Sequence, residues 1–183
     1  MYRYSVILSY IVLFLICCYC FIEYYKKINF SFGFVYITLS IISSYSALGA
    51  LRWSFPCNWK LEEMHVLTYF LIPSVAVPCT VLESWWRHGV LENAGVWIHL
   101  IVGLILSAFK MKRFKIFGMD AVNFCVFVNL LCLLIVTLLY EDFNIAILLL
   151  LFIMAQYAAY SKPPEHLYNY CLAGFTYAVC KSI

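Results

Sequence analysis

Charged side chains are scarce in this chain of 183 residues. Lys and Arg number 12, Asp and Glu number 9, and the charged share is 11%, whereas hydrophobic residues make up 66%. A soluble domain is about 25% charged and about 45–50% apolar. Too few polar side chains are therefore present to cover a water-facing surface. This excludes a soluble enzyme, a disordered chain and a nucleic-acid-binding domain, and it leaves a polytopic helical membrane protein.

The motifs of common catalytic chemistry are also absent. The chain contains no glycine-rich phosphate loop, no H-E-x-x-H and no G-x-S-x-G. Of its 9 cysteines only Cys57 falls outside the long apolar runs, and no Cys/His pattern has the spacing of a zinc site. In a membrane core a free cysteine behaves as a small hydrophobic residue. We therefore expect no metal site and no cofactor.

Six long runs contain no Asp, Glu, Lys or Arg. A helix needs about 20 mostly apolar residues to cross a bilayer. Residues 145–154 are apolar on every face, which suits a helix and not the alternating strand of a β-barrel. The expected spans are Tyr4–Ile22, Phe30–Leu51, Met64–Leu82, Asn93–Phe109, Ala121–Tyr140 and Phe143–Tyr160.

A seventh span is expected over Glu165–Ile183, after Pro163 and Pro164. Proline suits a first helical turn because its missing N–H would be unpaired there in any case. The stretch is richer in Tyr, Asn and Thr than the others, so the alternative is six spans followed by an interfacial or re-entrant helix. Seven helices use about 140 residues. Residues 1–183 are therefore expected to form a single transmembrane helical domain, an all-α bundle with no extramembrane domain.

The distribution of positive charge predicts the orientation. In a seven-span chain the basic residues on the N-terminal side are Arg3, Arg52, Lys60, Lys110, Lys112, Arg113, Lys115 and Lys162, against Lys26, Lys27, Arg87 and Lys181 on the other. Positive charge in short loops stays cytoplasmic. The N-terminus is therefore expected in the cytoplasm. The first run lacks a small-x-small cleavage pattern, so we expect it to be retained as a span.

Arg52, His65 and Asp120 fall at one membrane boundary in this topology. Arg52 ends the second span, His65 begins the third, and Asp120 begins the fifth. An Arg–carboxylate pair would offset the cost of desolvating both ions. Asp120 and Asn123 are three residues apart and so share a helix face. We interpret this group as a structural clamp between helices, with an active site or an ion path as the alternative.

His99 lies near the middle of the fourth expected span. A neutral imidazole in hydrocarbon still needs a hydrogen-bond partner. We interpret His99 as bonded to a Ser, Thr or Asn side chain of a neighbouring helix. The functional alternative is a proton relay or a catalytic base, because ionisable groups within a span are costly and are often functional.

Two further groups of residues are given structural interpretations. Glu83 pairs with Arg87 at a spacing of four, and we interpret both as solvated loop charges. Ser43, Ala47 and Ala50 recur at helical spacing, which predicts a face of close helix contact. The prolines at positions 73 and 78 predict a kink in the third span.

The sequence favours a multi-pass integral membrane protein with a non-enzymatic role, such as binding, conduction or assistance in assembly. The expected partners are the lipid bilayer and, beyond it, a membrane protein or a lipid ligand. One alternative is a membrane-embedded enzyme acting on a lipid, with His99 or His65 beside Asp120. Such an enzyme needs two of these groups within hydrogen-bond reach in a water-accessible pocket. The other alternative is a small proton- or ion-coupled transporter, with His99 in a cavity open to one side.

Overall fold

The computed structural model describes residues 2–28, 33–89, 97–98, 100–105, 119–159 and 164–182. All regular structure in these ranges is helical and none of it is strand, which confirms the all-α class. The helices are α1 (Tyr2–Ile28), α2 (Phe34–Ser54), α3 (Trp59–Leu71), the π-helical turn η1 (Ile72–Ala76), α4 (Val77–Arg87), α6 (Met119–Tyr140), α7 (Phe143–Ala159) and α8 (Pro164–Ser182).

Several of these helices are long and apolar enough to cross a membrane. Four qualify, over Tyr2–Lys27, Phe34–Ser54, Trp59–Arg87 and Asn123–Tyr140, and they coincide with the first, second, third and fifth expected spans. The apolar part of α7 is shorter, and α8 has 19 residues of more polar composition. About half of the fourth expected span lies outside the described residues. Its described residues, 97–98 and 100–105, are helical. The number of seven spans therefore stays a prediction.

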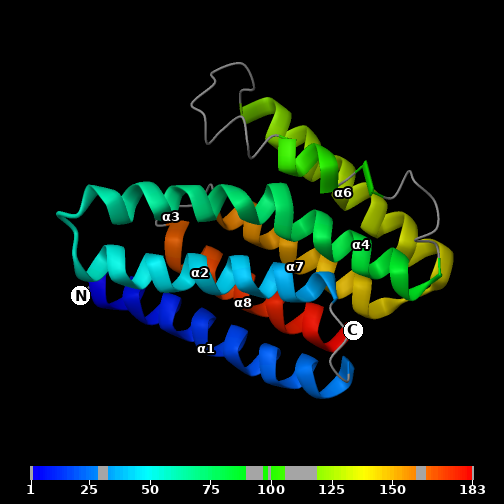
Figure 1. Cartoon of the computed structure of the whole chain (residues 1–183), viewed down its shortest axis with the longest axis horizontal. Helices are drawn as coiled ribbons and strands as arrows, with labels where there is room; N and C mark the ends of the chain where they lie inside the picture. The colour runs from blue at the N-terminus through cyan, green and yellow to red at the C-terminus, as the bar shows by residue number, and fades with distance from the viewer. Residues whose placement is uncertain are drawn as a thin grey trace.

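Helices α1 and α8 run parallel to each other. Asn169 Nδ2 donates to Ser9 Oγ at 2.9 Å, and Cys180 Sγ approaches the Cys20 carbonyl oxygen at 3.8 Å. Both pairs are separated by 160 residues, so the two helices keep one register along their length. The ends of the chain consequently lie at opposite ends of the bundle, with α2 antiparallel to α1 (Figure 1).

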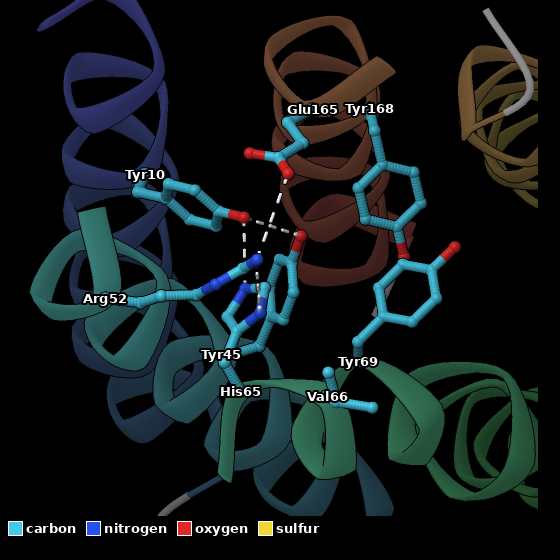
Figure 2. Close-up of a pocket in the computed structure, with 8 residues that line it drawn as sticks. All are labelled: Tyr10, Tyr45, Arg52, His65, Val66, Tyr69, Glu165 and Tyr168. Atoms are coloured by element: carbon cyan, nitrogen blue, oxygen red, sulfur yellow. Dashed lines mark hydrogen bonds and ion pairs between the residues drawn. The ribbon is translucent and has the colours of Figure 1, made fainter. Parts of the chain in front are cut away.

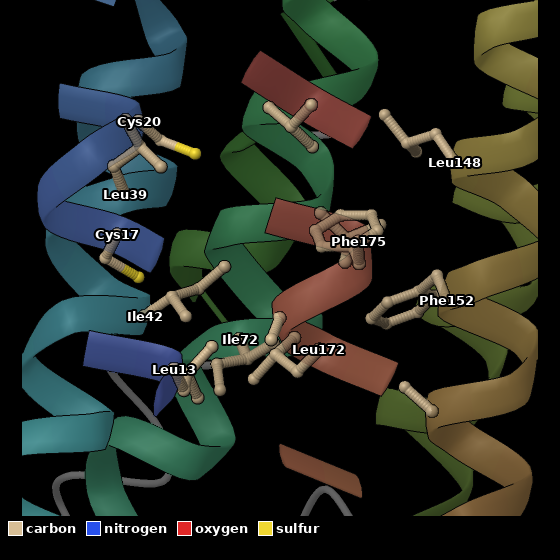
Figure 3. Close-up of a cluster of buried hydrophobic side chains, with 14 of the residues drawn as sticks. Leu13, Cys17, Cys20, Leu39, Ile42, Ile72, Leu148, Phe152, Leu172 and Phe175 are labelled. Atoms are coloured by element: carbon tan, nitrogen blue, oxygen red, sulfur yellow. The ribbon is translucent and has the colours of Figure 1, made fainter. Parts of the chain in front are cut away.

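Apolar side chains form both the interior and much of the outer surface. Ile42, Ile72, Leu172 and Phe175 are fully buried in one cluster between α1, α2, η1, α7 and α8 (Figure 3). The exposed large hydrophobic residues include Leu8, Ile11, Leu15, Ile22, Phe124, Phe127, Leu138, Leu139, Ile147 and Leu150. Several polar side chains are buried instead, namely Ser9, Thr38, Asn129, Asn169 and Thr176. An apolar exterior around internal polar groups suits a lipid environment.

The third expected span contains a widened turn. Residues Ile72–Ala76 form the π-helical turn between α3 and α4, with Pro73 inside it and Pro78 just after it. Proline has no N–H to donate and its ring displaces the carbonyl of the preceding turn. The Thr38 hydroxyl of α2 donates to the Ala76 carbonyl at 2.9 Å. The interruption expected at the prolines thus takes the form of a π turn whose backbone finds a partner on a neighbouring helix.

The contact face of α2 differs from the expected one. Ser43, Ala47 and Ala50 are only half-buried, whereas Gly49 is buried. A Cβ atom at Gly49 would collide with the ring of Tyr10 on α1. The closest approach of α1 and α2 is therefore at Gly49, and of the expected small-residue face Ala50 packs against the core.

Glu83 is buried, and its interpretation as a solvated loop charge was wrong. Only 3% of the residue is exposed. Its carboxylate accepts hydrogen bonds from the Phe34 N–H at 2.8 Å and from the Tyr24 hydroxyl at 3.2 Å. The Phe34 N–H begins α2 and has no partner within that helix. A Cβ at Gly33 would collide with the Tyr24 hydroxyl. We call this group the Glu83 cap, and it joins α1, α2 and α4.

Candidate functional site

Polar side chains from four helices meet where α2 ends and α3 and α8 begin. Arg52 lies in the last turn of α2, and His65 lies in α3 after the short turn that joins the two helices. Tyr10 comes from α1 and Glu165 from the first turn of α8. Because α1 and α8 are parallel, their N-terminal ends lie side by side at this end of the bundle. Figure 2 shows the four side chains converging.

A chain of hydrogen bonds leads from Arg52 into the interior. Arg52 Nη1 lies 3.4 Å from His65 Nδ1, and His65 Nε2 lies 3.0 Å from the Tyr10 hydroxyl. The Tyr10 hydroxyl is 3.3 Å from that of Tyr45, which donates to Asn169 Oδ1 at 3.2 Å. The Tyr45 ring also stacks on the His65 ring, with centroids 4.8 Å apart. One network thus links α1, α2, α3 and α8.

The available donors and acceptors allow only one direction of donation along this series of hydrogen bonds. Arginine only donates, so His65 Nδ1 accepts from Arg52 and the imidazole proton resides on Nε2. His65 Nε2–H then donates to Tyr10, and the Tyr10 hydroxyl proton points to Tyr45. Tyr45 in turn uses its own proton toward Asn169. Both nitrogens of His65 are therefore engaged, and the imidazole is neutral.

The inner end of the chain consists of groups that do not take up a proton. Asn169 Nδ2 donates to Ser9 Oγ at 2.9 Å, and the Ser9 hydroxyl donates to the Val6 carbonyl at 2.7 Å. An amide side chain and a backbone carbonyl are hydrogen-bonding groups and not bases at ordinary pH. The network ends there as a satisfied polar core, which suits a structural tie between α1, α2 and α8.

Arg52 also contacts two carboxylates. Its Nη2 lies 3.2 Å from Glu62 Oε1, and its Nη1 lies 4.0 Å from Glu165 Oε1. The Glu62 side chain is 59% exposed, whereas those of Arg52 and Glu165 are 27% and 29% exposed. An exposed pair contributes about 0–1 kcal/mol. Glu165 is therefore the more enclosed partner, although its distance from Arg52 is longer.

A cavity of about 220 Å³ lies beside this network. Its wall combines four tyrosines with three ionisable side chains and one aliphatic residue: Tyr10, Tyr45, Tyr69, Tyr168, Arg52, His65, Glu165 and Val66. We call it the Arg52 pocket. Val66 and Tyr69 are exposed, so the cavity has an open side. It is smaller than the pockets of about 300–1,000 Å³ that hold drug-sized ligands.

Two polar atoms at the Arg52 pocket are buried without a hydrogen-bond partner among the described residues. They are Glu165 Oε2 and the Tyr168 hydroxyl. Tyr168 is only 2% exposed, and its ring centroid lies 5.4 Å from that of Tyr69 (Figure 2). Buried polar atoms in a native protein are nearly always hydrogen-bonded. These two atoms are therefore the ones in the pocket wall with free capacity for a ligand or for water.

The structure brings together only part of the expected polar group. Arg52 and His65 are in contact, and the acids at Arg52 are Glu62 and Glu165. The backbone at Asp120 is in the first turn of α6, while its side chain and the whole of His99 lie outside the described residues. Asn123 is an exposed residue of α6, a helix that packs on α4, η1 and α7.

The sequence held a signal for the acid that was missed. Glu165 follows the two prolines at the start of the last expected span, and the seven-span topology already puts that position on the side of Arg52 and His65. Glu165 and Tyr168 are also three residues apart and thus share a helix face. Tyr10 and Tyr45 carried no such signal, because the chain has 15 tyrosines spread along its length. No pattern in the sequence marked Asn169 as their partner.

The described residues contain no group of three or more His, Cys, Asp or Glu side chains arranged to hold a metal ion. No known protein family, no curated protein and no solved structure matches the chain. The class that fold and composition define is a helical bundle with several helices capable of spanning a membrane. The chemistry of the Arg52 pocket is therefore the basis for a function.

Proposed function

We propose that this protein is a seven-span membrane protein that binds a small polar ligand in the Arg52 pocket, with the pocket and the N-terminus on the cytoplasmic side. The observation that carries the proposal is the cavity of about 220 Å³ with two buried polar atoms that lack partners among the described residues. A concave site with an aromatic wall and a few convergent polar groups is the usual form of a ligand site.

The parallel arrangement of α1 and α8 supports the seven-span topology. If α1 is the first crossing, a parallel α8 must be an odd-numbered crossing. Arg3 of α1 donates to the carbonyls of Trp53 and Ser54, which places its guanidinium at this same end. Arg52 of α2 adds a second basic side chain there. The positive-inside tendency then favours the cytoplasm for this side.

The hydrogen-bond chain favours binding over catalysis and over proton transport. A general base needs a free lone pair within reach of substrate, but Nδ1 of His65 accepts from Arg52 and Nε2 carries a proton used toward Tyr10. A proton path needs an acceptor at its far end, and this chain ends on an amide, a hydroxyl and a backbone carbonyl. The network therefore serves as a rigid wall for a bound molecule.

Labelling of Cys57 tests the topology. Cys57 lies between α2 and α3 and is exposed, whereas the other eight cysteines are buried or half-buried. A membrane-impermeant maleimide should label the wild-type protein only after the cells are permeabilised, and Cys57→Ser should abolish this signal. Labelling of Cys57 in intact cells would contradict the proposed orientation.

A cysteine in the pocket tests its accessibility. Val66→Cys in a Cys57→Ser background introduces a thiol at the exposed rim of the Arg52 pocket. In detergent, small water-soluble methanethiosulfonates should modify Val66→Cys and leave the Cys57→Ser parent unmodified. An unreactive Val66→Cys in folded protein would show that the cavity is closed to water and would overturn the binding function.

A further inference from the structure

We propose that the ligand of the Arg52 pocket is a small protonated amine, whose N–H groups are bound by Glu165 and Tyr168. This inference rests on the proposed binding function and specifies its ligand class. Three features carry it: the charges around Arg52, the two buried polar atoms without partners among the described residues, and the aromatic lining of the pocket.

The charges at the pocket favour a cation. Arg52 is shared between two carboxylates, those of Glu62 and Glu165. His65 adds no charge, because the bond from Arg52 to its Nδ1 requires the neutral imidazole. Within the pocket wall the charges of Arg52 and Glu165 cancel, and Glu62, which contacts Arg52 from outside the wall, adds one negative charge. A monovalent cation beside Glu165 would balance it, whereas an anion would meet an Arg52 that already has two partners.

The buried polar atoms favour a cation that donates hydrogen bonds. Glu165 Oε2 can only accept when the carboxylate is ionised, and the Tyr168 oxygen can accept as well. Both atoms are buried and lack partners in the described part of the chain. A primary ammonium supplies up to three N–H donors, and such a donor would satisfy Glu165 Oε2 in a charge-assisted bond. A quaternary ammonium has no N–H and would leave both oxygens unpaired.

The aromatic lining is compatible with such a cation. The ring centroids of Tyr45, Tyr69 and Tyr168 lie 6.0, 6.1 and 5.4 Å from one another, so the three rings form one continuous surface. Aromatic faces attract cations through their quadrupole. The same rings give the methylene groups next to the ammonium an apolar contact. The small volume restricts the ligand to a short amine.

Two sources can supply this chemistry: a free amine from the aqueous side, or the ethanolamine headgroup of a membrane lipid. Both present a primary ammonium on a two-carbon stem. The pocket lies at the end of the bundle where the spans are expected to leave the membrane, so either has access to it. The experiment below separates them.

The test measures the modification rate of Val66→Cys in Cys57→Ser protein purified in detergent. The reagents are aminoethyl methanethiosulfonate, which carries a primary ammonium, and sulfonatoethyl methanethiosulfonate, which carries a negative charge. Each rate is divided by the reagent's rate with 2-mercaptoethanol. We expect the ammonium reagent to be favoured about tenfold, since a local charge concentrates the opposite ion by a factor of this order. Glu165→Gln should remove the preference.

Glu63→Gln is the matched control, because it removes an exposed carboxylate of the neighbouring helix that is not part of the pocket wall. It should leave the preference nearly unchanged. Ethanolamine should slow the modification of Val66→Cys, and tetramethylammonium at equal concentration should not. Slower modification in phosphatidylethanolamine nanodiscs than in phosphatidylcholine nanodiscs identifies the lipid headgroup as the source. Equal rates in the two, with protection by free ethanolamine, identify a soluble amine.

The outcomes separate the two proposals. Equal rates for the two charged reagents, or equal protection by ethanolamine and tetramethylammonium, would overturn the amine and leave the accessible pocket intact. A Val66→Cys thiol that reacts with no reagent in folded protein would overturn the pocket itself, and the amine with it. A preference that survives Glu165→Gln would show that this carboxylate is not the binding group.

Discussion

The two ends of the bundle each hold a carboxylate between helices, and the two are used differently. In the Glu83 cap the carboxylate is 3% exposed and accepts from the Phe34 N–H and the Tyr24 hydroxyl. In the Arg52 pocket, Glu165 has one oxygen 4.0 Å from Arg52 and a second without a partner among the described residues. A carboxylate whose bonds are made by the fold stabilises the fold. One with an unused acceptor beside a cavity is available to a ligand.

Removing the Glu83 carboxylate should have the largest effect on the stability of the protein. Glu83→Ala leaves the Phe34 N–H and the Tyr24 hydroxyl buried without their acceptor, and each such group costs about 1–3 kcal/mol. We expect a loss of about 3 kcal/mol in the free energy of unfolding. Chemical unfolding in detergent, followed by tryptophan fluorescence, measures it. Glu63→Gln, at an exposed site, should unfold like the wild type, and an equally mild effect of Glu83→Ala would contradict the cap.

Tyr45 and Tyr168 both line the Arg52 pocket and form a matched pair of test sites, because only the Tyr45 hydroxyl is hydrogen-bonded among the described residues. Tyr45→Phe leaves Asn169 Oδ1 and the Tyr10 hydroxyl short of a partner, so we expect a loss of about 1–2 kcal/mol in unfolding free energy. Tyr168→Phe deletes a buried hydroxyl that has no partner among the described residues, and its stability should equal or exceed that of the wild type. Equal losses in the two variants would mean that the hydrogen-bond chain does not hold the helices together.

Glu165→Gln should separate stability from binding. The side chain is partly exposed and its distance to Arg52 is 4.0 Å, so the change in unfolding free energy should stay below about 1 kcal/mol, as for exposed ion pairs. Ethanolamine should nevertheless no longer protect Val66→Cys from modification. If Glu165→Gln unfolds as readily as Glu83→Ala, the two ends of the bundle are alike and Glu165 is a structural residue.

The smallest effect is expected at Asn123. It is exposed on α6, away from the contacts that form the Arg52 pocket, so Asn123→Ala should change neither the unfolding transition nor the protection by ethanolamine. Asn129 on the same helix is a suitable comparison, since it is buried and donates to the Cys125 carbonyl at 2.7 Å. A strong loss of stability in Asn123→Ala, but not in Asn129→Ala, would restore the interpretation of Asn123 as part of a clamp.

Much of the secondary structure follows from local composition. Uncharged runs of about 20 residues predict spanning helices, and at four of the expected spans the structure has a helix long and apolar enough to cross a membrane. The prolines at 73 and 78 likewise predicted an interruption, which is present at Ile72–Ala76. Its form as a π turn was not predictable, because it depends on which carbonyls a neighbouring helix such as α2 can satisfy.

The composition of the polar site followed from the sequence only in part. Arg52 and His65 were predicted to lie at the same membrane boundary, because the second and third expected spans are antiparallel and only a short turn joins them. Asp120 was expected as the acid from its boundary position alone, and this stays a prediction because its side chain lies outside the described residues. Among the described residues, Glu62 and Glu165 are the acids at Arg52. Several acids fall at one expected membrane boundary, and helix order along the chain does not specify which helices are neighbours.

The sequence by itself determined the apolar character of the chain, its helical class and the positions of most of the described helices, because these depend on hydrophobicity summed over one segment at a time. Only the tertiary structure decided that α8 packs directly on α1, that Glu83 is a cap, and that Glu165 has an oxygen beside a cavity with no partner among the described residues. These properties depend on which side chains meet across helices, and a difference of one residue around a helix turns a side chain away from its partner.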